Sequence, residues 1–143
     1  MKVLYAMAAL LIAAPVLADD HKARGPARHD VRGILNTAGY TTVRDLELDD
    51  GLWEVEVQHE DGRWYDIHVV PDSGEILDPR AGKPVLPGKE ILARLEAGGY
   101  TKVRDLELED AVWEADATAP DGKRVEVRLN GFDGTVLVTE TDD

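Results

Sequence analysis

The chain has 143 residues, no cysteine and a formal net charge of −13 at pH 7. Such an excess of carboxylates repels phosphate backbones, which argues against nucleic acid as a partner and favours basic proteins, basic peptides or cations; a charged surface that only keeps the protein soluble accounts for the same excess. The lack of cysteine excludes disulfides, so stability has to come from packed cores.

The N-terminus is predicted to be an export signal. Lys2 precedes an apolar run from Val3 to Ala14, and small or aliphatic residues lead to Ala18. The run is too short to span a bilayer, and its ending suits a signal peptidase. We therefore expect cleavage after Ala18, a mature chain that begins at Asp19 without a membrane span, and a periplasmic or secreted protein. A retained membrane anchor is the alternative.

The rest of the chain consists of two copies of one unit. An offset of 60 residues aligns 31–78 with 91–138 without a gap, and 17 of the 48 aligned positions are identical, which indicates an internal duplication. Two copies with so long a period do not make a solenoid. The predicted boundaries are a signal peptide at 1–18, a disordered mature N-terminus at 19–25, a first unit at 26–78, a proline-rich linker at 79–86, a second unit at 87–139 and an acidic tail at 140–143.

Each unit is predicted to open with one helix. In the first unit, Pro26 stands at a suitable start, and apolar residues recur at helical spacing until Gly39. In the second unit, Pro87 precedes the same pattern and Gly98 ends it. Proline fits the first turn of a helix and glycine its end. One apolar stripe per helix means that each helix packs on a single surface.

Antiparallel strands are predicted to follow. Residues 53–57 and 65–69 alternate between apolar and polar side chains, which is typical of half-buried strands. A three-residue loop at 60–62 fits this parity and puts Gly62 where a positive φ is needed. The inward pairs of this register are Val57 with Tyr65, Val55 with Ile67 and Trp53 with Val69.

The strand before this hairpin is expected to turn at Asp50-Gly51, which would set Leu46 and Leu48 inward on the same face. A short last strand follows a turn at 71–74. The predicted fold is therefore α+β, with two tandem units that each pack one helix on an antiparallel sheet of three or four strands. Within the linker, the apolar pair Val85-Leu86 is expected to dock on one of the units.

These elements resemble a known family. The pattern consists of a helix ending in Gly39-Tyr40, the strand Val-Arg-Asp-Leu-Glu-Leu at 43–48, the strand Trp-Glu-Val-Glu-Val at 53–57, the run Tyr-Asp-Ile-His-Val at 65–69 and the turn Ser-Gly-Glu-Ile at 73–76. It resembles the PepSY domain, twice over, with departures in the second copy at Ala115, Ala117 and Ala119-Pro120. The resemblance implies a cystatin-like fold and an extracytoplasmic role in binding proteins or modulating a protease. The pattern contains no catalytic motif.

The polar positions of the strands share the outer face of each predicted sheet, away from the helix. In the first unit this face carries Asp45, Glu47, Glu54, Glu56 and Asp66. The second unit repeats it with Asp105, Glu107, Glu114, Asp116 and Glu126, and has Arg128 in the place of His68. Like charges opposite one another cost stability, so the pattern favours a site for a cation or a basic partner. A face that is merely solvated, with arginines relieving the repulsion, is the alternative.

Trp64 also lies on the outer face, beside Asp66 and His68, and its counterpart is Arg124. An aromatic residue among charges is a typical interface anchor; packing against the linker or the other unit would explain it equally well. The candidate partner-binding residues are Trp64, Asp66, His68, Glu54, Glu56, Asp116 and Glu126.

Metal binding is considered at two places. After cleavage, Asp19-Asp20-His21 would present a free amine and a histidine at position three, a set that wraps Cu(II) or Ni(II) in a square plane; coincidence in so short a motif is the alternative. Oxygen ligands on the acidic faces would favour calcium, although no loop has the spacing of an EF-hand.

Catalysis finds little support. Ser73 is the only serine and lies in a predicted turn, and neither His59 nor His68 has a plausible nucleophile nearby. The predicted function is a non-enzymatic protein-binding module without a cofactor, which engages another extracytoplasmic protein or a basic peptide and modulates a peptidase or an envelope sensor. The alternative is a metal-binding or metal-sensing protein. The sequence leaves open the partner, the oligomeric state and whether the two sheets form one surface.

Overall fold

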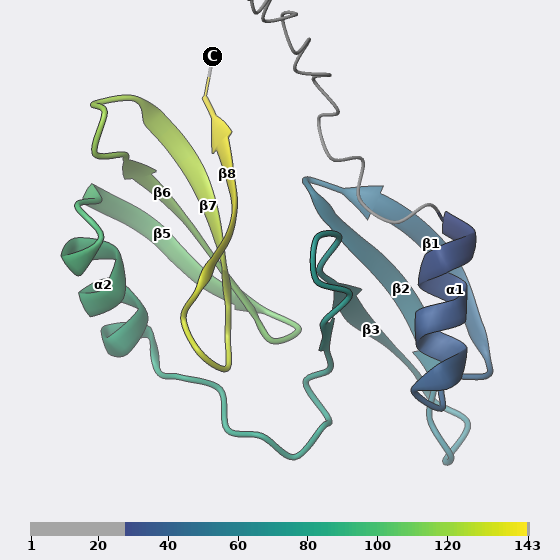
Figure 1. Ribbon diagram of the computed structural model, residues 1–143. Helices are drawn as coiled ribbons and strands as arrows, with labels where there is room; N and C mark the ends of the chain where they lie inside the picture. Colours follow the sequence, from purple (N-terminus) through teal and green to yellow (C-terminus); the bar gives the residue numbers. More distant parts are fainter. Residues whose placement is uncertain (1–27, 143) are drawn as a thin grey trace, which may run out of the picture.

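The computed structural model describes residues 28–142 (Figure 1). The predicted signal peptide at 1–18, the segment at 19–25 and the Asp19-Asp20-His21 motif lie outside the described residues. Within 28–142, no helix is long and apolar enough to cross a membrane.

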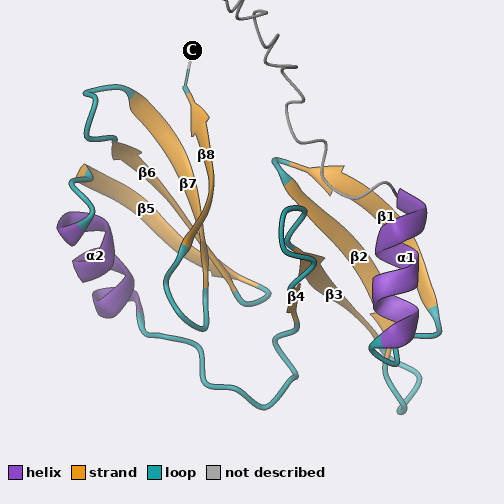
Figure 2. Cartoon of the chain, in the orientation of Figure 1, coloured by secondary structure: helices purple, strands orange, loops and turns teal. Residues whose placement is uncertain are grey.

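Each repeat contains one helix and a four-stranded antiparallel sheet whose strands follow chain order. Repeat 1 consists of α1 (Arg28–Thr37), β1 (Val43–Asp49), β2 (Leu52–Gln58), β3 (Trp64–Val69) and β4 (Ile76–Leu77). Repeat 2 consists of α2 (Gly88–Ala97), β5 (Thr101–Glu109), β6 (Val112–Thr118), β7 (Arg124–Asn130) and β8 (Val136–Thr141) (Figure 2). This confirms the predicted α+β fold. Strand β8 runs two residues past the boundary expected for the second unit.

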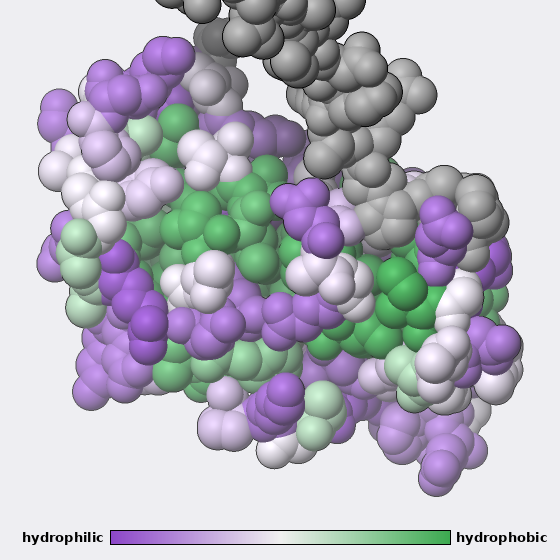
Figure 3. Space-filling model, viewed as in Figure 1, coloured by the Kyte–Doolittle hydropathy of each residue, from purple (hydrophilic) through white to green (hydrophobic). Residues whose placement is uncertain are grey.

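The helices cover the inner faces of the sheets. Val31 and Leu35, one helical turn apart on α1, are 0% exposed and pack in one cluster with Val55 and Ile67. Ile91 and Leu95 of α2 do the same in a second cluster. Burying such side chains contributes roughly 1.5–3 kcal/mol each. Each repeat therefore has a core of its own, and the space-filling view shows apolar residues gathered over both repeats (Figure 3).

Both helices end in the same hydrogen-bonded motif. Gly39 adopts φ 98°, which brings the Tyr40 amide within 2.9 Å of the Leu35 carbonyl oxygen. In repeat 2, Gly99 has φ 86°, and the Tyr100 amide donates to the Leu95 carbonyl at 3.0 Å. This left-handed residue satisfies carbonyls that the helix end would otherwise leave open. The Gly-Tyr pair of the sequence pattern thus terminates the helix.

The central hairpins have the predicted register. Trp53 pairs with Val69, Val55 with Ile67 and Val57 with Tyr65, and repeat 2 shows the equivalent pairs.

The first hairpin turns at Asp50-Gly51 and sets Leu48 opposite Trp53, as predicted, but its register differs beyond Glu47. Its register shifts between Arg44 and Glu47, so Arg44 rather than Asp45 lies opposite Glu56. Asp45 adopts φ 51°, a conformation that aspartate tolerates better than most residues. This bulge takes Asp45 out of the ladder. Leu48, expected to face inward, is 57% exposed, because it lies on an edge strand outside the buried clusters.

A third cluster joins the two repeats. Leu52, Val70 and Leu77 of repeat 1 pack with Val112 of repeat 2, and residues of the β7–β8 region cover them. The two sheets remain separate. The repeats are thus held by a shared apolar core, which we call the junction, and their sheets do not pair into one.

The linker is docked rather than extended in solvent. The Leu86 amide donates to the Gly131 carbonyl at 2.7 Å, and the Trp113 indole N–H donates to the Leu86 carbonyl at 3.0 Å. Leu86 also packs against the core of repeat 2. The expectation that the Val85-Leu86 pair docks on a repeat holds for Leu86, which fixes the linker on repeat 2.

Candidate functional site at the junction of the repeats

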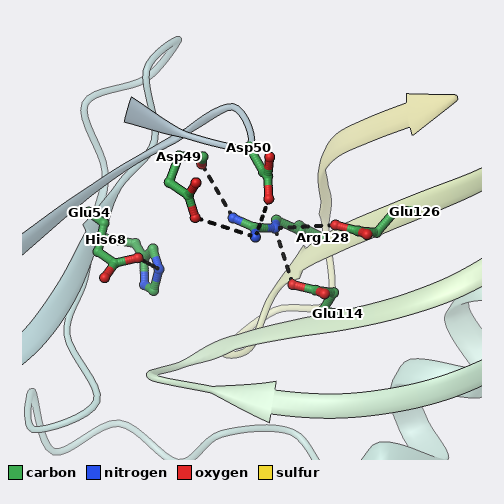
Figure 4. A network of polar contacts seen from close by, with 7 residues as sticks. All are labelled: Asp49, Asp50, Glu54, His68, Glu114, Glu126 and Arg128. Carbon is green, nitrogen blue, oxygen red and sulfur yellow. Dashed lines mark hydrogen bonds and ion pairs between the residues drawn. The ribbon is translucent and has the colours of Figure 1, made fainter. Parts of the chain in front are cut away.

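Arg128 on β7 reaches from repeat 2 to the tip of the β1–β2 hairpin of repeat 1. Its guanidinium donates to the Asp49 carbonyl at 3.3 Å and to the Asp50 carboxylate at 3.1 Å (Figure 4). Its Nε lies 3.3 Å from a carboxylate oxygen of Glu114 and 3.9 Å from one of Glu126. One buried cation thus contacts carboxylates of both repeats. The planar guanidinium suits this position, because its several N–H donors point in different directions within one plane.

His68 occupies the equivalent position on β3 of repeat 1. It lies opposite Glu54 as predicted, with Nε2 3.8 Å from the carboxylate. The residue is only 4% exposed, although it was expected on an open outer face. The reason is the junction, because the tip of the β5–β6 hairpin of repeat 2 approaches this ring. The contact is reciprocal: each repeat presents residue 68 or 128 to the hairpin tip of the other.

Burial sets the charge state of His68. Desolvation lowers the pKa of its ring, and the Arg128 guanidinium lowers it further. Glu109, the Asp110 backbone and Asp49 oppose this shift without cancelling it. The neutral form of His68 is therefore favoured, whereas Arg128, at the equivalent position of repeat 2, carries a permanent positive charge.

Three carboxylates near His68, those of Glu54, Asp66 and Asp110, have no arginine or lysine as an ion-pair partner among the described residues. Desolvation raises the pKa of Glu54, and the charges of Asp66, Asp49 and Glu109 raise it further. Asp66 and Asp110 also have a raised pKa, first through desolvation and then through neighbouring carboxylates. Closely spaced carboxylates at this end of the outer face thus disfavour one another's ionised form.

A cavity of about 60 Å³ lies between the repeats. Its lining, as far as the described residues show, is three equivalent pairs and one valine: Asp49 and Glu109, Glu54 and Glu114, His68 and Arg128, with Val112. Sequence analysis missed the hairpin tips, residues 49–50 and 109–110, as parts of the site. Their acidic doublets recur in both copies, which was the available signal.

The far end of the outer face is different. In repeat 1, Arg44 binds Glu56 and its guanidinium lies 4.0 Å from the centre of the Trp64 ring. The Arg44 contact lowers the pKa of Glu56. Trp64 is half-buried on the outer face as expected, and Arg44 covers its ring.

In repeat 2, Arg124 replaces Trp64, and a hollow of about 360 Å³ is lined by Lys102, Arg104 and Arg124 together with small residues. Asp116 lies 3.6 Å from Arg104. The outer face of repeat 2 was expected to be acidic, with Arg128 in the place of His68. It is acidic at the junction and basic at the far end, because the bulge brings Arg104 opposite Asp116.

Metal ligation gains no support from residues 28–142, where no group of three or more histidine or acidic residues is arranged to hold a metal ion. The copper or nickel site at Asp19-Asp20-His21 stays a prediction.

Comparisons with known proteins fit the duplicated architecture. A family model described as "Peptidase propeptide and YPEB domain" matches residues 2–80 and, separately, residues 82–140. No curated protein matches. A solved structure of the Bacillus megaterium YpeB C-terminal domain is similar to this chain with 12% identity and a TM-score of 0.32, over 82% of this chain. The chain spans 64% of the length of that structure. Because the family model covers both repeats, this protein belongs to the peptidase propeptide and YPEB domain family, the PepSY family that the sequence pattern indicated.

Proposed function

We propose that this protein is a non-enzymatic, extracytoplasmic binding module that receives a basic segment of another protein on the acidic outer face of repeat 1. The observation that carries the proposal is the difference between residues 68 and 128. Arg128 pairs with Glu114 of repeat 2 and with Asp50 at the hairpin tip of repeat 1. His68 is buried and favours the neutral form. Glu54 and Asp66 therefore have no positively charged side chain of this chain as an ion-pair partner among the described residues, and a basic group of another protein could supply one.

Two further points support a binding role. The family description names peptidase propeptides, which act by contact with another protein rather than by chemistry of their own. In addition, the described residues that line the junction cavity include no serine, threonine, cysteine or lysine that could act as a nucleophile beside the buried imidazole. Charge complementarity of this kind steers a basic partner and sets specificity.

An affinity pull-down from an extracytoplasmic extract tests the proposal. The bait is the mature protein at low salt, and the variant is Glu56→Gln with Asp66→Asn in repeat 1. The matched control carries Asp116→Asn with Glu126→Gln, the equivalent positions of repeat 2. We expect a partner to be retained by the wild type and by the control but lost by the repeat 1 variant and in high salt.

Retention of the same partner by the repeat 1 variant would contradict the proposal. So would the absence of any salt-sensitive partner for the wild type.

A further inference from the structure

The cavity at the junction is lined mainly by groups that accept hydrogen bonds. Four of its side chains are carboxylates, from Asp49, Glu54, Glu109 and Glu114, and Arg128 is the one permanent cation among the described lining residues. Arg128 already pairs with Glu114 and with the hairpin tip of repeat 1. With His68 neutral, the negative charge of the cavity exceeds its positive charge.

His68 adds a second and independent observation. Its residue is 4% exposed, and its Nδ1 atom is buried without a hydrogen-bond partner among the described residues. Nε2 lies 3.8 Å from the Glu54 carboxylate, and a neutral ring that carries its single proton on that nitrogen has Nδ1 as an acceptor. Buried polar atoms are almost always paired in folded proteins. His68 lines a cavity rich in carboxylates, so its unpaired ring nitrogen supports a site for a hydrogen-bond donor there.

The chemistry of that donor follows from the charges and the volume. A cavity of about 60 Å³ holds only a few water-sized groups. A primary ammonium is compact, carries three donors and has no acceptor. A guanidinium is larger and planar, and a metal ion would need a ligand group that residues 28–142 do not assemble. Arg128 shows that the same kind of surface, 60 residues along, holds a nitrogen cation.

We propose that this cavity binds a primary ammonium group, the side-chain amine of a lysine in the partner, and that protonation of His68 expels it. The source of the amine rests on the proposed function. Protonation places a positive charge on the ring and makes both of its nitrogens donors, so the ring then repels the ammonium and offers it no acceptor. The groups that face the ring are Glu54 on β2, Asp49 on β1, Glu109 and Asp110 at the β5–β6 tip and Arg128 on β7.

Methylammonium titration of the purified protein, followed by NMR of the His68 ring nitrogens, tests the site without any partner. We expect the ring signals to shift and saturate with methylammonium at pH 8, and the apparent affinity to fall as His68 is protonated. Sodium at equal ionic strength and tetramethylammonium, which has no N–H donor, should leave the signals in place.

Two variants sharpen the test. Glu54→Gln removes one lining charge and should weaken methylammonium binding by about tenfold, the scale of one charged hydrogen bond. Glu96→Gln, on an exposed position of α2, is the matched control and should bind as the wild type does. His68→Arg supplies the cation within the chain and should abolish the response of the Glu54 carboxylate signal; its thermal unfolding reports whether the junction still forms.

An equal response to tetramethylammonium or sodium, or an unchanged affinity in Glu54→Gln, would overturn the ammonium site. The two proposals fail separately. If methylammonium binds and no partner is retained in the pull-down, the site stands and the binding module falls. If methylammonium does not bind and capture of a partner still depends on Glu56 and Asp66, the module stands and the site falls.

Discussion

Repeat 1 and repeat 2 share a backbone but treat their buried polar positions differently. Repeat 2 places Arg128 at the junction and satisfies its Trp113 indole with the linker. Repeat 1 places the neutral His68 at the equivalent point and leaves the buried indole nitrogen of Trp53 without a partner in the described residues. Features that both copies share, such as the inward tryptophan, belong to the fold, whereas residues that differ between the copies are candidates for a specific function. Residues 68 and 128, at which the two copies differ, both line the cavity at the junction.

A second difference is a polar cluster present in repeat 1. The Asp78 carboxylate accepts hydrogen bonds from the hydroxyls of Tyr40 and Tyr65, and its other oxygen accepts from the Arg80 amide at 2.7 Å. Asp78 is 5% exposed. Desolvation, followed by the hydrogen bond to Asp78, raises the pKa of the Tyr40 hydroxyl far above its ordinary value. In repeat 2 the counterpart of Asp78 is Val138, which packs in the junction.

The largest effect is expected from breaking the apolar part of the junction. Leu52→Ala removes a side chain that is 1% exposed and should lower the free energy of unfolding by about 3 kcal/mol, through lost burial and a cavity. Urea denaturation followed by tryptophan fluorescence measures it. Leu48→Ala, at a position 57% exposed, is the control and should cost far less. Equal losses would show that the junction contributes no more than an exposed strand.

A smaller loss is expected at the cluster of repeat 1. Asp78→Ala leaves two tyrosine hydroxyls and one amide without their acceptor, and should lower the free energy of unfolding by about 2 kcal/mol. The same urea experiment applies. Glu60→Ala, at an exposed position of the β2–β3 turn, is the control, with a change expected within about 0.5 kcal/mol. If Asp78→Ala left the free energy of unfolding unchanged, water would be replacing the carboxylate as the hydrogen-bond acceptor, and the cluster would not contribute to stability.

Sequence patterns predicted the central hairpin well and the junction poorly. The alternation at 53–57 and 65–69 fixed the register, because one face had to be buried. The bulge at Asp45 could not be predicted from the alternation of apolar and polar residues. It requires only a residue that tolerates a positive φ, as aspartate does. The burial of His68 depends on how one repeat packs against the other, which alternation within a strand does not encode.

One signal for the junction was present in the sequence. Leu52 and Val112 are apolar at positions whose parity places them on the outer face, and they recur in both copies. Both are buried in the cluster that joins the repeats. Apolar residues on a face that is otherwise charged indicate that part of the face is covered.

The smallest effect concerns the dependence of stability on pH. The pKa of His68 is lowered from its ordinary value of 6.5, so the unfolded chain binds its proton at a higher pH than the folded chain does. Above the ordinary pKa, His68 is neutral in both states and does not destabilise the fold. As the pH falls from the ordinary pKa toward the lowered pKa of the folded protein, the unfolded chain takes up the proton first and the free energy of unfolding decreases. The raised pKa values of Glu54 and Asp66 act in the opposite sense at lower pH.

Urea denaturation at pH 8 and pH 6 should therefore show the wild type losing more stability than His68→Gln between the two values. His59→Gln, at a half-exposed histidine, should behave as the wild type does. A wild type and a His68→Gln variant with the same pH dependence would contradict the assignment to His68.

The most direct test of the difference between the repeats is an NMR titration of the His68 ring nitrogens against pH, in the wild type and in Arg128→Gln. The buried neutral imidazole predicts a pKa below 6.5 in the wild type and an upward shift in the variant, because the guanidinium that disfavours the imidazolium is gone. A wild-type pKa at or above 6.5, unchanged by Arg128→Gln, would contradict the account that repeat 1 lacks the cation that repeat 2 carries.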